Sequence, residues 1–289
     1  MDSVATLTGV HVDISTEDAF GRTLIAPIGI PTPHQTLLSL RTSLAGGAEL
    51  SVEQETGQSV LVMRSDAYAG HDRIRLDYTF RPGGTAYPEA IFQPRVNRFT
   101  RAADPLVAEV ASLIEGSNSE RETIERLVAH TANVFTYGHP EDRFYDGRED
   151  IPYLGCGTTA GSCIDINMYL IAALRSVGIE AGYVAGPFYP AEKNGRCDDM
   201  HCWVVTRSGW QGRDILEWDI AHHLKMGTRT VRPGLNPKPG WRAAVSHSMG
   251  WDVPALGIVG LKLLSEPMWV SADGDVTYAT VEISSRGAL

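Results

Sequence analysis

The sequence lacks the features typical of nucleic-acid-binding, membrane-spanning and secreted proteins. No run of basic residues is interleaved with aromatics, and the formal net charge of −10 over 289 residues disfavours a nucleic-acid partner. No stretch reaches the ~18 apolar residues that a membrane-spanning helix needs. The first twenty residues show neither the basic region nor the apolar core of a secretion signal. We therefore expect a cytoplasmic protein without nucleic-acid or membrane partners, in an oligomeric state that the sequence leaves open.

Cysteine is scarce, and its few copies are clustered. The chain has four cysteines, at positions 156, 163, 197 and 202. In a protein expected to be cytoplasmic, such clustering favours metal binding or catalysis over a disulfide framework. The hydrophobic fraction of 43% is ordinary for a globular protein with a real core.

The pattern of apolar residues divides the chain into two parts and predicts an α+β fold. Residues 1–100 are β-rich, because several segments alternate apolar and polar residues between glycine-containing turns. They predict a small sandwich or barrel as an N-terminal domain, followed by a linker at 81–94. Residues 101–289 are predicted to form a second, helix-plus-sheet domain, ending in a mixed strand and loop extension.

Helical and strand patterns alternate in this second part. Ser119 and Glu122 form a plausible capping box before a helix with one apolar face. A helix at 163–177 is expected to bury a single apolar stripe and to end at Gly178. The following segments are expected to be a strand at 179–185, a loop at 186–199, and strands at 201–207 and 213–220.

Cys163 is predicted to occupy the first position of its helix. Ser162 and Asp165 fit the S-x-x-D capping box, which places the helix start between them. There the unpaired N–H groups and the positive end of the helix dipole favour a thiolate over a thiol. The same N–H groups could stabilise an oxyanion formed by attack on a carbonyl. The alternative is that Cys163 is a small buried hydrophobic residue.

A predicted hairpin supplies partners for this cysteine. If the strands at 201–206 and 214–220 pair about a turn centred on Trp210, His201 stands directly opposite Asp219. Opposed residues share a sheet face with Cβ atoms about 4.5–5.5 Å apart. A carboxylate at that distance can accept an imidazole N–H and leave the other ring nitrogen free to act as a base. The pattern therefore indicates a Cys–His–Asp triad.

The same pairing gives the other face of the hairpin a coherent core. Cys202 would oppose Trp218, and Val204 would oppose Leu216. The register depends on the loop length, since a slip of one residue would move every side chain to the other face. The alternative is that His201 is a structural histidine and Asp219 a charged residue at the end of a strand.

These residues, in this order, resemble the transglutaminase-like superfamily of papain-like cysteine enzymes. AGSCIDINMYLIAALRSVGIEAGYVAG resembles its cysteine-helix-strand block, DDMHCWVV its histidine block and ILEWDIA its aspartate strand. FTYG at 135–138 also fits this pattern. The resemblance covers residues 120–225, whereas residues 1–100 match no motif. It implies a papain-like catalytic domain in which the cysteine helix packs on an antiparallel sheet.

The resemblance implies a role for each residue of the triad. Cys163 would be the nucleophile, His201 the general base and acid, and Asp219 the orienting carboxylate. The reaction would be acyl transfer from a small-molecule or peptide amide or ester, through an acyl-enzyme, to water or an amine. We expect hydrolysis, because water is always present and an amine acceptor needs its own site. No cofactor is expected.

Further residues are candidates for binding the substrate or completing the oxyanion hole. They are Tyr153, Gly161, Ser162, Trp203 and His222. For His222 and His223, the more common outcome is an exposed pair where a strand passes into a loop. Cys156 and Cys202 depart from the family pattern, and we consider Cys156 as a resolving thiol for an oxidised Cys163.

Two other interpretations compete with the thiol enzyme. The first is a zinc site drawn from Cys156, Cys163, Cys197, Cys202, His201, Asp219, His222 and His223. No CxxC or HxxxH spacing supports it, so no metal is predicted. The second is a binding module that keeps the fold without turnover.

Overall fold

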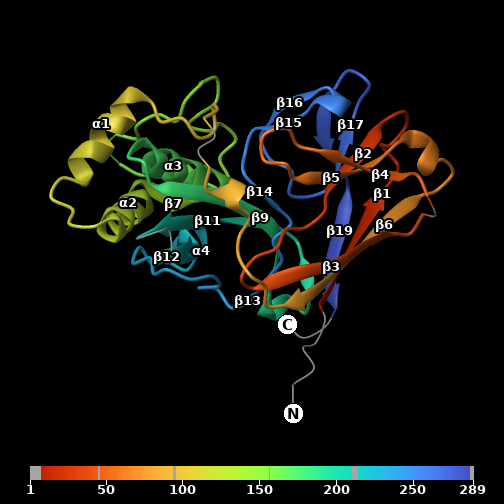
Figure 1. The fold of residues 1–289 in the computed structure, drawn as a ribbon, viewed down its shortest axis with the longest axis horizontal. Coiled ribbons are helices and arrows are strands. Elements are labelled where there is room, and N and C mark those ends of the chain that lie inside the picture. Colours follow the sequence, from red (N-terminus) through yellow and green to blue (C-terminus); the bar gives the residue numbers. More distant parts are fainter. Residues whose placement is uncertain (1–7, 45, 94–95, 156, 210–213, 287–289) are drawn as a thin grey trace, which may run out of the picture. The chain divides into compact units, whose positions relative to one another are not determined.

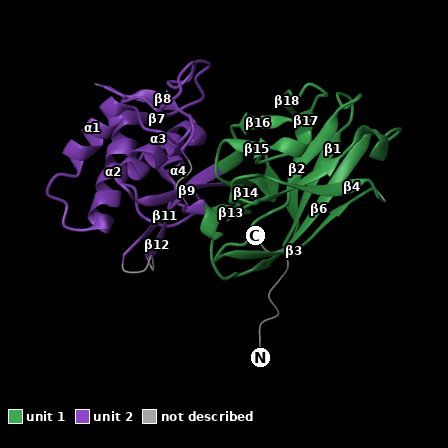
Figure 2. Cartoon of the chain, turned by 45° about the horizontal axis from the view of Figure 1, so that its top comes forward, with its two compact units in different colours: residues 1–90, 185–201, 239–289 green, residues 91–184, 202–238 purple. Residues whose placement is uncertain are grey.

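The computed structural model describes residues 8–44, 46–93, 96–155, 157–209 and 214–286. Its contacts divide the chain into two compact units, shown in different colours in Figure 2. The sandwich unit comprises residues 1–90, 185–201 and 239–289, and the helical unit comprises residues 91–184 and 202–238. This division differs from the predicted domains 1–100 and 101–289, because the last fifty residues pack with the N-terminal strands.

Two five-stranded antiparallel sheets make up most of the sandwich unit (Figure 1). The first runs in the order β10 (Arg196–Cys197), β19 (Val281–Arg286), β1 (Thr8–Ser15), β6 (Arg73–Pro82) and β3 (Gln35–Thr42). The second runs in the order β18 (Val276–Tyr278), β17 (Met268–Val270), β2 (Thr23–Pro27), β5 (Ser59–Met63) and β4 (Ala48–Val52). Strands from both ends of the sequence therefore share each sheet.

Shorter segments complete the sandwich unit. Strands β13 (Gly240–Arg242), β14 (Ser246–His247), β15 (Trp251–Val253) and β16 (Ile258–Leu261) precede the last three strands of the chain. Single turns of 3-10 helix lie at η1 (Ser65–Ala67), η3 (Ala191–Lys193) and η5 (Pro254–Leu256), and η2 (Glu89–Ile91) stands at the first boundary between the units.

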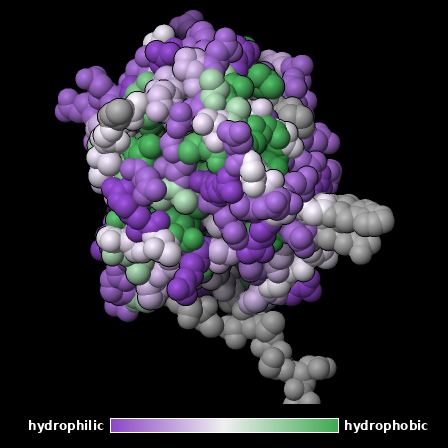
Figure 3. All heavy atoms as spheres, turned by 90° about the vertical axis from the view of Figure 1, so that its left-hand side faces the viewer, coloured by the Kyte–Doolittle hydropathy of each residue, from purple (hydrophilic) through white to green (hydrophobic). Residues whose placement is uncertain are grey.

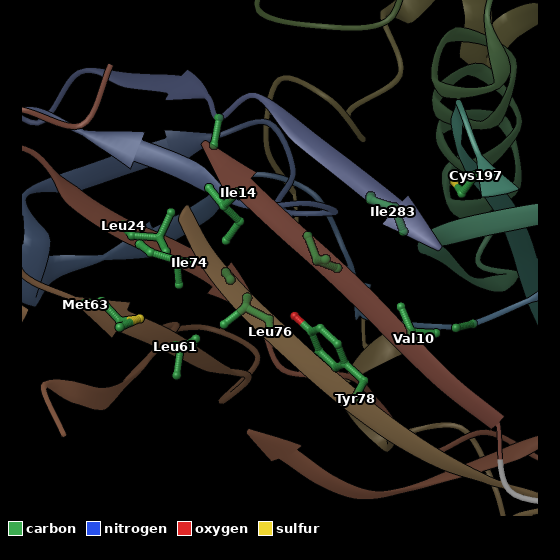
Figure 4. Close-up of a cluster of buried hydrophobic side chains, with 14 of the residues drawn as sticks. Val10, Ile14, Leu24, Leu61, Met63, Ile74, Leu76, Tyr78, Cys197 and Ile283 are labelled. Atoms are coloured by element: carbon green, nitrogen blue, oxygen red, sulfur yellow. The ribbon is translucent and has the colours of Figure 1, made fainter. Parts of the chain in front are cut away.

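The core of the sandwich forms because its strands alternate buried and exposed side chains. Ile74, Leu76 and Tyr78 of β6 are all buried on one face, and Figure 4 shows them beside residues of the second sheet such as Leu24 and Met63. Burying each such aliphatic side chain contributes about 1.5–3 kcal/mol. The alternation that predicted strands in residues 1–100 is thus the pattern that joins the two sheets.

The strand after the cysteine helix is longer than predicted. β9 (Glu180–Pro190) continues through residues expected to begin a loop. Its second half pairs with β13, where Gly240 lies opposite Pro190. A Cβ at Gly186 would lie 1.7 Å from the carbonyl oxygen of Ala243, so only glycine permits this approach. The partner residues lie some fifty positions later in the chain, and local pattern could not reveal them.

The helical unit is built around one buried helix. Its elements are α1 (Asp104–Leu113), α2 (Glu120–Val134), β7 (Phe135–Tyr137), β8 (Thr159–Gly161), α3 (Cys163–Ser176), β12 (Asp214–Trp218) and α4 (Ile220–Lys225), with parts of β9 and of β11 (Met200–Ser208). Every residue of α3 from 165 to 174 is buried. The prediction that this helix buries a single apolar stripe is therefore wrong, because α1, α2 and α4 all pack against it.

The outer face of the helical unit is polar. Figure 3 shows small hydrophobic areas separated by hydrophilic residues on the face that it presents. On α2 this exterior includes the ion pair of Arg121 with Glu125, one helical turn apart. Among the described residues, no helix is both long and apolar enough to span a membrane.

The cap of α2 gives a direct test of how the sequence starts this helix. The Ser119 hydroxyl accepts a hydrogen bond of 3.1 Å from the N–H of Glu122, as the capping box predicts. Ser119→Ala removes this acceptor and should lower the free energy of unfolding by about 1 kcal/mol, measured by urea denaturation. Ser112→Ala, at an exposed position inside α1, should not lower it, since alanine favours a helix interior. Equal losses would contradict this account of the cap.

Candidate active site

Cys163 is the first residue of α3, and a buried carboxylate holds the helix start in place. Ser162 is the N-cap, and its N–H donates to Asp165 Oδ2 at 2.7 Å, which forms the predicted capping box. The Ser162 hydroxyl donates to the same oxygen at 2.8 Å. Cys163 itself is 7% exposed. The prediction that the cysteine opens the helix is confirmed.

Two side chains from the preceding loop also bind Asp165. Arg143 donates to Oδ2 through Nη1, and the Tyr145 hydroxyl donates to Oδ1 at 3.0 Å. Asp165 is 1% exposed, so these donors replace the water that its carboxylate loses on burial. Burial, and secondarily the charge of Asp165, raises the pKa of Tyr145 and keeps it a donor. These contacts could not be predicted from the sequence, because the loop at 138–157 has no periodic pattern.

A short parallel pair of strands leads into the cysteine. Phe135 of β7 lies opposite Thr159 of β8, and Tyr137 lies opposite Gly161. The N–H of Gly138 extends the pair by donating to the carbonyl of Gly161 at 3.0 Å. A Cβ on Gly161 would lie 2.8 Å from the ring of Phe135, so glycine is required here. The FTYG segment therefore positions the residues that precede α3.

Cys202 contacts the thiol of Cys163. The Cys202 side chain is hydrogen-bonded to Cys163, and Asn167 Nδ2 donates to Cys202 Sγ at 3.2 Å. Burial, followed by the neighbouring Cys163, raises the pKa of Cys202 far above that of an ordinary thiol, although hydrogen bonds from Tyr183 and Asn167 oppose this. Cys202 is thus a thiol at neutral pH. From the sequence, Cys202 was noted only as a departure from the pattern of the transglutaminase-like superfamily.

The hairpin is present, but its register differs from the prediction by two residues. Val204 of β11 lies opposite Trp218 of β12, and Thr206 lies opposite Leu216. The predicted partners of Cys202 and Val204 are therefore wrong, as is direct opposition of His201 and Asp219. The predicted turn centre, Trp210, lies outside the described residues. A shift of two residues preserves the sheet face on which each side chain of the two strands lies.

Asp219 is the N-cap of α4 rather than a strand residue. Its carboxylate accepts the backbone N–H of His222 at 3.1 Å, and His222 Nδ1 lies 3.0 Å from Oδ2. Asp219 is fully buried. Residues 220–225 were expected to lie beyond a strand, and the short helix was missed, although an aspartate before IAHHLK is a possible cap signal.

Both histidines that follow Asp219 are buried, so the expected exposed pair is wrong. His223 Nδ1 donates to the carbonyl of Asp219 at 2.8 Å, and its Nε2 accepts the N–H of Arg232 at 3.4 Å. These two bonds define its tautomer and indicate a structural role. His222 instead contacts the carboxylate of Asp219.

His201 is the second residue of β11, and the boundary between the units cuts this strand directly after it. His201 is 5% exposed. The next residue on the strand is Cys202, whose thiol contacts Cys163. His201 also lies beside the ring of Phe188, at 5.9 Å between centroids.

The remaining candidates lie in different environments. Tyr153 is 38% exposed in the loop before β8, whereas Trp203 is fully buried on β11. Ser162 already donates both its N–H and its hydroxyl to Asp165. Cys156 lies outside the described residues, and Cys197 is buried in the core of the sandwich unit. Roles for these side chains in binding a substrate stay predictions.

None of the described cysteines belongs to a grouping that could hold a metal ion. Within the helical unit, Asp219 and His222 offer a carboxylate and an imidazole, ligand types that suit zinc. The zinc alternative is therefore narrower than the sequence allowed, and it would use the same Asp219 as the predicted triad.

A cysteine at the start of a buried helix, followed in the chain by histidine and aspartate, is the arrangement expected of papain-like cysteine enzymes. Residues 108–215 match the model of the transglutaminase-like superfamily. The match includes Cys163 and His201 and ends before Asp219. The resemblance recognised in the sequence is confirmed.

One solved structure of low sequence identity shares this fold. A “Putative Cysteine Protease” from Cytophaga hutchinsonii is 14% identical, with a TM-score of 0.54 over 98% of this chain and 91% of that one. The periplasmic domain of TgpA from Pseudomonas aeruginosa is 16% identical, with a TM-score of 0.39 over 79% and 92%. No curated protein matches the chain. Together, the family and the fold support a papain-like cysteine enzyme, without its reaction or substrate.

The donors to Asp165 can be tested by substitution. Arg143→Ala removes a charged donor from a buried carboxylate and should lower the free energy of unfolding by about 1–3 kcal/mol in urea denaturation. The matched control is Arg148→Ala in the same loop, where the pair with Asp150 is exposed and spans 3.6 Å. This control should change stability little. Similar effects of the two substitutions would contradict the role given to Arg143.

Proposed function

We propose that the protein hydrolyses an amide, peptide or ester bond through a thioester intermediate on Cys163. The observation that carries this proposal is the position of Cys163 at the start of the buried helix α3, where Asp165 and its donors hold the helix end. A thiol at a helix N-terminus gains from the helix dipole as a thiolate, which is the form that attacks carbonyl carbon.

His201 and Asp219 would supply the proton transfers. In this mechanism His201 takes the proton of Cys163 and later returns it to the leaving group. The carboxylate of Asp219 accepts an imidazole N–H, which orients the ring and stabilises its charged form. His222 would have a positioning role, because it binds the same carboxylate from α4. The contact of His222 Nδ1 with Asp219 Oδ2 at 3.0 Å supports the part given to this carboxylate.

The oxyanion of the intermediate would be stabilised by N–H groups at the start of α3. The first N–H groups of a helix have no acceptor within the helix and point toward its N-terminal end. The N–H of Ser162 is already used by Asp165, so we do not assign it this role. Gly161 would contribute because it has no side chain and so leaves room for a substrate to approach Cys163.

Water is the proposed acceptor of the acyl group. Hydrolysis needs no second binding site, whereas transfer to an amine, in crosslinking or amide formation, needs one. A non-catalytic binding protein with this fold is the alternative that retains the residues without turnover. A zinc protein is the other alternative, favoured only by the pairing of Asp219 with His222.

Selective alkylation tests whether Cys163 is activated. Iodoacetamide near neutral pH should label Cys163 first, because burial raises the pKa of Cys197 to about 12 and also raises that of Cys202. Groups whose pKa is raised stay protonated at this pH and react slowly with iodoacetamide. Cys163→Ala should abolish the fast labelling, as followed by peptide mass spectrometry, whereas Cys197→Ser is the matched control that should preserve it.

His201→Ala should slow the labelling of Cys163 near neutral pH if the imidazole activates this thiol. Equal labelling rates for the cysteines of the wild-type protein would count against a thiol enzyme. Metal analysis of the same preparation separates the zinc alternative. Stoichiometric zinc whose removal abolishes activity would overturn the proposed mechanism.

A further inference from the structure

One buried nucleophile in the helical unit has no part in the proposed reaction. Cys202 lies on β11 and is fully buried, and its side chain is hydrogen-bonded to Cys163. Asn167 follows Cys163 by one helical turn, so both face the same side of α3. Because Asn167 Nδ2 donates to Cys202 Sγ at 3.2 Å, that side is the one that β11 covers. Two thiols are thereby held against each other across a helix and a strand.

We propose that Cys163 and Cys202 form a reversible disulfide when a hydroperoxide oxidises Cys163. The proposal rests on the proposed function only in taking Cys163 as the more reactive thiol. It makes Cys202 the resolving cysteine, the role that the sequence had suggested for Cys156. The disulfide would block the nucleophile while protecting it from irreversible oxidation.

The chemistry proceeds in two steps. The thiolate of Cys163 attacks one peroxide oxygen, the O–O bond breaks, and sulfenic acid forms on Cys163 as the other oxygen leaves as an alcohol or water. The sulfur of Cys202 then attacks the sulfur of Cys163, the S–O bond breaks, and the hydroxyl leaves as water with the proton of Cys202. Two thiols lose two electrons in total, and the hydroperoxide gains them.

The surroundings of the two thiols define this order. Cys163 at the helix start is 7% exposed, whereas Cys202 is 1% exposed. The raised pKa of Cys202 keeps it protonated and therefore slow to react with peroxide itself. Cys197, the other described cysteine, belongs to the core of the sandwich unit, and its thiol donates to the carbonyl of Asp199 at 3.2 Å. It has no contact of this kind with a second thiol among the described cysteines.

The test treats the full chain with hydrogen peroxide and maps its peptides by mass spectrometry. In the wild-type protein we expect the loss of two hydrogen atoms, a crosslinked peptide pair containing Cys163 and Cys202, and full reversal by dithiothreitol. In Cys202→Ser, Cys163 should instead gain oxygen atoms that dithiothreitol does not remove. Cys197→Ser is the matched control and should behave like the wild type.

A disulfide of Cys163 with Cys156 or Cys197, or oxygen addition to Cys163 in the wild-type protein, would overturn the proposal. Mapping of the wild-type protein decides this even if Cys202→Ser fails to fold. The iodoacetamide rates separate this result from the proposed function. Fast labelling of Cys163 without the disulfide rejects the disulfide alone, and the disulfide without fast labelling rejects the activated nucleophile alone.

Discussion

The carboxylate of Asp165 is the constraint on which the start of the cysteine helix depends. It is buried, and it accepts hydrogen bonds from the backbone and hydroxyl of Ser162, from Arg143 and from Tyr145. Removing a carboxylate from water is costly, and a buried carboxylate is stable only where such donors compensate it. Satisfying Asp165 therefore fixes both the N-cap of α3 and the course of the preceding loop. Cys163 lies between the N-cap and this carboxylate, so its position follows from theirs.

The strands around the helix start extend this constraint. β7 pairs in parallel with β8, and the carbonyl of Gly161 accepts the N–H of Gly138. The ring of Phe135 leaves no room for a side chain at Gly161. The chain therefore enters α3 along a path held from both sides, by strand pairing before the N-cap and by the carboxylate after it. A nucleophile benefits from such support, because small displacements of reacting atoms are costly in rate.

Local signals in the sequence were enough to predict the starts of α2 and α3 and several strands within residues 1–100. Ser162 with Asp165, and Ser119 with Glu122, are close in sequence and act through the same backbone geometry in any protein. The alternation in β6 likewise reports which face is buried. The resemblance to the transglutaminase-like superfamily has the same order of cysteine, histidine and aspartate that the helix start and the predicted hairpin had indicated.

What the sequence could not provide were contacts between distant segments. Arg143 and Tyr145 bind Asp165 from a loop without periodicity, and β19 joins the sheet of β1 from the other end of the chain. The hairpin register was wrong by two residues because it depended on an assumed turn length. That error also hid α4, whose N-cap is Asp219, and the contact of Cys202 with Cys163. Each miss came from a tertiary contact that overrides or completes a local preference.

Cys163 is the residue that we propose carries the acyl group. The most direct measurement incubates a His201→Ala variant with a panel of peptide, amide and ester substrates and weighs the intact protein and its peptides. A thioester adduct on Cys163 is predicted, since the variant retains the nucleophile while the imidazole that assists release of the acyl group is missing. The mass of the adduct would also identify the acyl group. An adduct on another residue, or turnover that persists in Cys163→Ala, would contradict the account.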